Sequence, residues 1–89
     1  MNRNHETKKA AALRYEQGRD LAPKVVARGR GKTAEKIVEL AREHNIPMVE
    51  DRNLVRMLEA LDVDTEIPTE LYQAVAEVLV FVYRMNKIS

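Results

Sequence analysis

The chain has 89 residues, enough for one domain with a single modest core, and its apolar content of 45% is typical of a packed globule. Its 15 lysines and arginines nearly balance 14 aspartates and glutamates, and a formal net charge of +1 argues against a dedicated nucleic-acid binder. The lack of cysteine excludes disulfides and thiolate metal sites. The sequence has no signal-peptide core and no apolar run long enough for a bilayer, so we expect a cytoplasmic protein without direct membrane insertion.

The N-terminal third is predicted to form two strands. Residues 1–8 are polar and charged, and we expect them to be a flexible segment ahead of one domain over residues 9–89. Residues 10–15 (AAALRY) are ambiguous, because three alanines favour a helix whereas alternating leucine and tyrosine favour a strand; we predict a strand. Residues 24–28 (KVVAR) follow a proline and contain two β-branched valines, so they are predicted to be a second strand.

The middle of the chain is predicted to form a helix and a short strand. Apolar residues recur at helical spacing on one face of residues 33–44, Asn45 suits a left-handed position after the helix, and Pro47 stops it. Residues 48–50 are predicted to be extended. The order strand, helix, strand indicates a βαβ unit in which residues 24–28 and 48–50 run parallel in one sheet.

Two further helices complete the predicted fold. Asp51 is a good N-cap for a short helix over residues 52–60, and Pro68 fits the first turn of a last helix over residues 69–85. The predicted class is therefore α/β. Its small mixed sheet has about three strands (10–15, 24–28 and 48–50), flanked by three helices (33–44, 52–60 and 69–85).

The last helix is more apolar than one buried face requires. One line of side chains along it contains Leu71, Val75, Val78 and Val82, and a second line contains Tyr72, Ala76, Leu79 and Tyr83. Together the two lines cover about twice the arc that a surface helix usually buries. Either the whole helix is packed in the core, or the second line is a docking surface, in which the small Ala76 would leave a shallow depression.

A cluster of cations lies between residues 24 and 36. It contains Lys24, Arg28, Arg30, Lys32 and Lys36. Such a stripe could meet an anionic partner, although a solvated edge is the favoured explanation, because acids elsewhere balance its charge. The segment RGKT at 30–33 lacks the glycine that a phosphate loop needs five positions before Gly31, where Val26 stands.

No set of residues indicates catalysis or metal binding. His5 and His44 are far apart, and neither has an acidic neighbour at a spacing typical of a metal site. The acids near residues 50–66 follow no calcium-loop pattern. We therefore expect a protein that is not an enzyme and has no cofactor and no metal.

Three segments taken together resemble one protein family. They are residues 22–29 (APKVVARG), residues 45–50 (NIPMVE) and residues 67–79 (IPTELYQAVAEVL). In this order they are similar to the cytoplasmic C-terminal domain of the FlhB/YscU export-switch proteins of flagellar and type III secretion systems. The resemblance runs over residues 10–83 and implies that residues 10–15 form a strand.

The chain departs from that family's pattern in two ways. Members carry membrane helices ahead of this domain, and they carry a self-cleaving Asn-Pro-Thr-His turn before the strand that matches residues 10–15. Aligning that strand places residues 5–8 (HETK) on the motif, and only Thr7 matches. The resemblance therefore implies a stand-alone FlhB-like (FlhX) form of the downstream half, without self-cleavage.

The resemblance also implies a binding site. The family's switch domain offers a hydrophobic patch to the export signals of rod and hook substrates, and the matching positions are Ala22, Pro23, Ala76 and Leu79. Ala76 and Leu79 belong to the second apolar line of the last helix. The other members of that line, Tyr72 and Tyr83, are therefore also expected to bind the partner. The expected partners are export substrates and membrane export-gate proteins, which would recruit the chain to the inner face of the membrane.

The family's strand ahead of the cleavage turn is missing, so the resemblance implies an open sheet edge. That edge could pair with a second copy, giving a homodimer, or with a membrane-bound FlhB truncated before its own downstream half. The alternative function is a small nucleic-acid-binding protein that uses the basic stripe of residues 24–36, chiefly Lys24, Arg28, Arg30 and Lys32.

Overall fold

The computed structural model describes residues 7–88. Most of the predicted flexible segment and His5 lie outside this range. The elements in chain order are β1 (Lys9–Arg14), β2 (Lys24–Arg30), α1 (Lys32–Glu43), α2 (Arg52–Glu59), a single 3-10 turn η1 (Thr69–Leu71) and α3 (Tyr72–Ile88). The α/β class is confirmed, and each of these elements was predicted to within a few residues.

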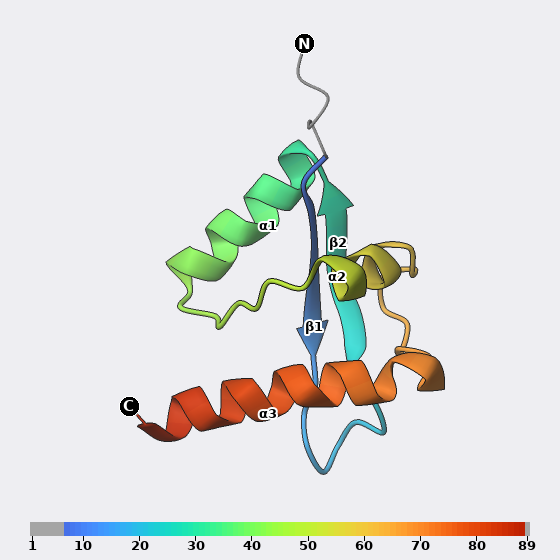
Figure 1. The fold of residues 1–89 in the computed structure, drawn as a ribbon, viewed down its shortest axis with the longest axis vertical. Coiled ribbons are helices and arrows are strands. Elements are labelled where there is room, and N and C mark those ends of the chain that lie inside the picture. Colours follow the sequence, from blue (N-terminus) through green and yellow to red (C-terminus); the bar gives the residue numbers. More distant parts are fainter. Residues whose placement is uncertain (1–6, 89) are drawn as a thin grey trace.

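The sheet consists of β1 and β2, joined by the loop over residues 15–23 (Figure 1). The two strands are antiparallel, from Lys9 opposite Arg30 to Arg14 opposite Lys24, with one irregularity at Ala12 and Leu13. The ambiguous segment 10–15 is therefore a strand, as predicted. Hairpin pairing with β1 occupies one edge of β2 along its whole length.

The predicted third strand and the parallel βαβ unit are wrong. Residues 48–50 have no regular structure and are exposed, and the part of the chain described contains only the two-stranded antiparallel sheet. The other edge of β2 is partly occupied by the segment before α3. There the Val25 amide donates to the Thr65 carbonyl (3.0 Å) and the Asp64 amide donates to the Val25 carbonyl (2.6 Å). Residues 48–50 instead link α1 to α2 across the front of the strands (Figure 1).

The core lies between the sheet, α2 and the start of α3. Its buried side chains come from β2, α2 and the segment 67–75, and they are Val25, Leu54, Leu58, Ile67, Leu71 and Val75. Burying each such side chain contributes roughly 1.5–3 kcal/mol. These contacts hold α3 across the end of the sheet where β1 stops and β2 begins (Figure 1).

Local signals in the sequence set the helix ends. The Asp51 carboxylate accepts a hydrogen bond from the Leu54 amide (3.0 Å), which confirms Asp51 as the N-cap of α2. Asn45 has a φ of 57°, the left-handed conformation expected after α1. The last helix begins with η1 directly after Pro68 and continues as α3.

Candidate docking groove

A groove of about 550 Å³ runs between α3 and the loop over residues 15–23. We call it the α3 groove. The loop and its end contribute Tyr15, Gln17, Leu21, Ala22 and Pro23 to its lining, and the C-terminal part of the chain contributes Ile67, Tyr72, Val75, Ala76, Leu79, Val80, Val82 and Tyr83. The groove therefore unites segments that are 44 or more positions apart in the sequence.

The two apolar lines of α3 have different environments. The first line is buried in the core at Leu71 and Val75, and Val78 packs against that core, whereas Val82 is half-buried and lines the groove. The second line borders the groove: Tyr72 is 44% exposed, Tyr83 is 62% exposed, Ala76 is exposed, and Leu79 is half-buried against the core. The second line is thus not sealed inside the protein, and core packing alone does not account for it.

All six predicted partner-binding residues line the α3 groove. Ala22 and Pro23 are buried at its base, whereas Tyr72, Ala76 and Tyr83 remain exposed along α3. The sequence did not identify the loop residues Tyr15, Gln17 and Leu21. Leu21 is an apolar residue in an otherwise polar stretch of the loop, and it is 91% exposed. It could have indicated an apolar surface on this loop, but nothing in the sequence linked the loop to α3.

The lining of the groove is uncharged. Its polar groups are the Gln17 amide and three tyrosine hydroxyls, and these tyrosines are the only three in the sequence. The Tyr83 hydroxyl donates a hydrogen bond to Gln17 Oε1 at 2.6 Å, which ties the loop to α3. Such a lining, apolar with a few polar groups, is typical of a site for an uncharged ligand segment.

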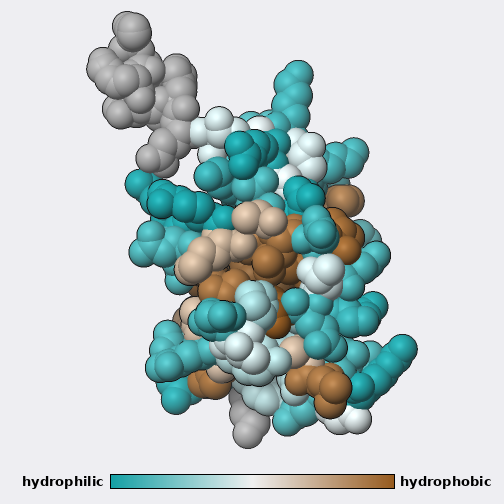
Figure 2. Space-filling model, turned by 90° about the vertical axis from the view of Figure 1, so that its right-hand side faces the viewer, coloured by the Kyte–Doolittle hydropathy of each residue, from teal (hydrophilic) through white to brown (hydrophobic). Residues whose placement is uncertain are grey.

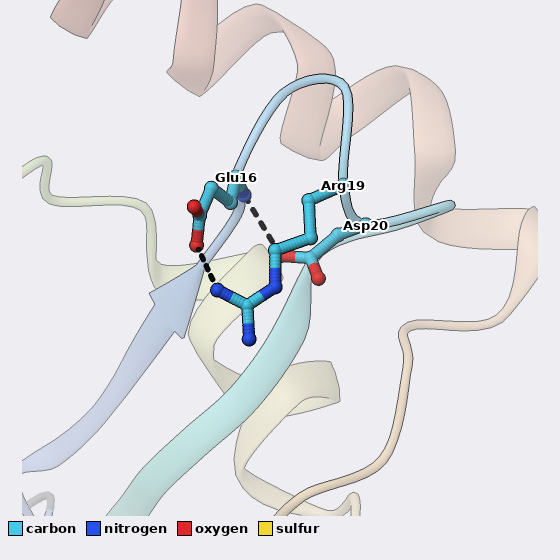
Figure 3. Close-up of polar contacts among 3 residues, drawn as sticks. All are labelled: Glu16, Arg19 and Asp20. Carbon is cyan, nitrogen blue, oxygen red and sulfur yellow. Dashed lines mark hydrogen bonds and ion pairs between the residues drawn. The ribbon is translucent and has the colours of Figure 1, made fainter.

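The loop wall is shaped by its own polar contacts (Figure 3). The Glu16 amide donates to Asp20 Oδ2 (2.8 Å), and the Arg19 guanidinium donates to the Glu16 carboxylate (3.1 Å). Gly18, with a φ of 87°, allows the tight turn between them. Glu16, Arg19 and Asp20 do not line the groove, so the lining that the loop contributes is uncharged.

The cations of the basic stripe do not share one free surface. Arg30 donates two hydrogen bonds to Glu59, at 2.8 and 3.3 Å, and Glu59 is only 7% exposed. This hydrogen bonding and the charge of Arg30 hold the pKa of Glu59 below its usual range and raise the pKa of Arg30. Lys24 and Arg28 are half-buried, whereas Lys32 and Lys36 are exposed.

The described residues 7–88 contain no group of three or more histidines, aspartates or glutamates that could hold a metal ion. In the same range, no helix combines the length and the apolar character that a membrane crossing requires. Apolar surface also gathers outside the groove. Figure 2 shows it in the middle of the face on which β2 and the segment after α2 lie, framed by hydrophilic residues.

Comparison with known proteins finds relatives of two kinds. The uncharacterized protein YlqH of Bacillus subtilis (strain 168) is 41% identical over 80 residues, which are 90% of this chain and 86% of YlqH. The flagellar biosynthetic protein FlhB of Aquifex aeolicus (strain VF5) is 46% identical over 79 residues, which are 88% of this chain. Those residues are only 23% of that FlhB, so the chain spans about a quarter of the relative.

The chain also superposes on solved structures of related domains. The C-terminal domain of PscU superposes with a TM-score of 0.81 at 33% identity, covering 86% of this chain and 99% of that domain. The cytoplasmic domain of FlhB from Shewanella putrefaciens superposes with a TM-score of 0.85 at 38% identity, covering 91% of this chain and 64% of that domain. A model of the FlhB HrpN YscU SpaS family matches residues 5–82. The chain therefore belongs to this family, as its three characteristic segments predicted, and corresponds to the C-terminal cytoplasmic domain of its members.

Proposed function

We propose that this chain is a non-enzymatic component of flagellar or type III protein export, which binds export substrates or export-gate partners through the α3 groove. The observation that carries this proposal is the meeting of Ala22 and Pro23 with Ala76 and Leu79 in one uncharged groove. Family membership supplies the context of protein export, because the relatives include flagellar biosynthetic proteins.

The dimensions of the groove fit an extended peptide. Tyr72 and Tyr83 are 11 positions apart on α3, which corresponds to about 16 Å at roughly 1.5 Å per residue. An extended chain of about five residues covers that length. Because alternate side chains of such a peptide point the same way, two or three apolar side chains would enter the groove. A shallow site of this kind binds weakly, which suits a receptor that must release its cargo.

The chain would act in the cytoplasm, at the inner face of the membrane, where export-gate proteins would recruit it. A membrane-bound FlhB that lacks its own downstream half is a further expected partner. No Asn-Pro-Thr-His motif occurs in the sequence, so we expect no self-cleavage. Nucleic-acid binding through residues 24–36 has less support, because Arg30 is already paired with Glu59.

The first prediction places a charge in the groove. Ala76→Asp should weaken binding of an export-signal peptide at least tenfold, because the carboxylate would lose water when an apolar peptide covers it. Ala76 suits this test better than Leu79, since Ala76 is exposed whereas Leu79 also packs against the core. The matched control is Gln73→Asp, which adds the same charge to an exposed position of α3 outside the groove lining.

Tyrosine fluorescence can follow this binding directly. The chain has no tryptophan, and all three of its tyrosines line the groove, so a peptide without aromatic residues should change only their emission. The probes are overlapping peptides from the N-terminal segments of rod and hook proteins of Bacillus subtilis, alongside scrambled versions. Equal affinity of the Ala76→Asp and Gln73→Asp variants would remove the groove from the binding site.

A further inference from the structure

The hydrogen bond between Tyr83 and Gln17 contributes little to the stability of the fold. Both side chains are exposed, and water competes for such a bond. Yet it joins positions 66 residues apart, and it is the one side-chain hydrogen bond between the loop and α3 within residues 7–85. A contact that joins the two walls of an apolar groove and adds little to stability is a candidate for taking part in ligand binding.

The pair leaves a hydrogen-bond donor free beside the groove. Tyr83 donates to Gln17 Oε1, so the Oε1 atom is engaged while the two N–H groups of the same amide have no partner within the described residues. An extended peptide brings backbone carbonyls that lose water when its side chains enter an apolar site, and each needs a donor. No charged side chain lines the groove, so its side-chain donors are the tyrosine hydroxyls and the Gln17 amide, and the amide is the one that carries two N–H groups and is oriented by the contact with Tyr83.

We propose that Gln17 donates a hydrogen bond to one backbone carbonyl of an extended, uncharged, apolar peptide in the α3 groove, and that Tyr83 is the positioning residue that orients the Gln17 amide. This inference rests on the proposed function of the groove and adds how the peptide is held. Apolar side chains in the groove supply affinity without fixing position, because neighbouring apolar pockets are alike. A single polar contact at the Tyr83 end fixes the register of the peptide.

The test measures peptide binding to the full chain by NMR titration, with the rod and hook peptides named above. Gln17→Ala should weaken binding about three- to tenfold, the effect of one hydrogen bond. Tyr83→Phe keeps the ring and should weaken binding by a similar factor, and the double variant should lose little more. Gln73→Ala is the matched control for Gln17→Ala, since it removes an exposed amide from α3 outside the groove lining, and it should bind as the wild type does.

An amide-to-ester scan of the peptide separates a direct contact from a general change in the groove. An ester weakens the preceding carbonyl as an acceptor, so one ester position should reduce binding to the wild type more than its neighbours do. That same ester should have no effect on binding to the Gln17→Ala variant. A structural role for Gln17 would instead leave every ester with the same effect in both proteins.

The outcomes distinguish the two proposals. If the wild type binds none of the peptides, the proposed function and this inference both fail. If the wild type binds but Gln17→Ala and Tyr83→Phe bind equally well, the groove remains a docking site and the role of the Gln17–Tyr83 pair is overturned. Loss of binding in Gln73→Ala equal to that in Gln17→Ala would also overturn it.

Discussion

Glu59 is a buried carboxylate on α2, and its charge is held by Arg30 at the end of β2. Because Arg30 lowers the pKa of Glu59 in the folded state, the folded protein binds a proton at this site less readily than the unfolded chain does. The stabilisation from this pair is therefore complete above the ordinary glutamate pKa of about 4.3. It is lost as the pH falls through the lower pKa of the folded state.

Replacement of this carboxylate tests that linkage. Glu59→Gln should lower the midpoint of thermal unfolding at neutral pH, because a charge-assisted hydrogen bond becomes a neutral one. The same variant should lose less stability than the wild type between about pH 5 and pH 2. Thermal unfolding followed by circular dichroism at several pH values measures both effects. Parallel pH curves for the two proteins would show that the pair does not couple folding to pH.

At the scale of elements, β2 and α1 approach closely at Gly29. A Cβ atom at this buried position would lie 2.7 Å from Thr33 Cβ and closer still to Thr33 Cγ2. Gly29→Ala should therefore destabilise the fold by about 1–3 kcal/mol, the usual effect of overpacking. Thr33→Ala in the same chain removes Cγ2 and should restore part of the loss. Chemical denaturation of the single and double variants gives the coupling energy, and purely additive effects would contradict the close contact.

Elements with local signals were predictable from the sequence, whereas those that depend on distant partners were not. Asp51, Asn45 and Pro68 act on the backbone within a few residues, so the helix ends followed from them. The three extended residues 48–50 carry no such signal, and whether they pair depends on which segment already occupies the edges of β2. A strand prediction there was wrong for this reason.

The candidate site also has a part that local sequence signals predicted and a part that depends on distant contacts. The exposed apolar line of α3 follows from helical rotation, and the family resemblance added Ala22 and Pro23 to it. Gln17 escaped prediction because it contacts Tyr83, and a contact between residues 66 positions apart leaves no local pattern in the sequence. The general location of a groove was thus predictable, but its second wall and its polar end were not.

At the scale of the whole molecule, the outer edge of β1 has no neighbouring strand among residues 7–88. Self-pairing of this edge would give a homodimer, but the ends of β1 oppose it. In an antiparallel pair of β1 strands, Lys9 of each copy would face Arg14 of the other, and like charges in this position are destabilising. Parallel pairing would place Lys9 against Lys9. We therefore predict that the chain is a monomer and that this edge suits a partner strand with acidic ends.

Reversal of one charge should convert this edge into a self-complementary one. In Arg14→Glu the antiparallel pair brings Glu against Lys9 at both ends, and each favourable cross-strand pair is worth roughly 0.2–1 kcal/mol. Two pairs should tighten dimerisation about 2- to 30-fold, and the gain should shrink as salt screens the charges. Arg42→Glu, an exposed position on α1, makes the same change in net charge away from the edge and should stay monomeric. Sedimentation equilibrium at low and high salt distinguishes the three proteins. A wild-type dimer, or equal association of the two variants, would mean that charges on β1 do not govern how this edge pairs.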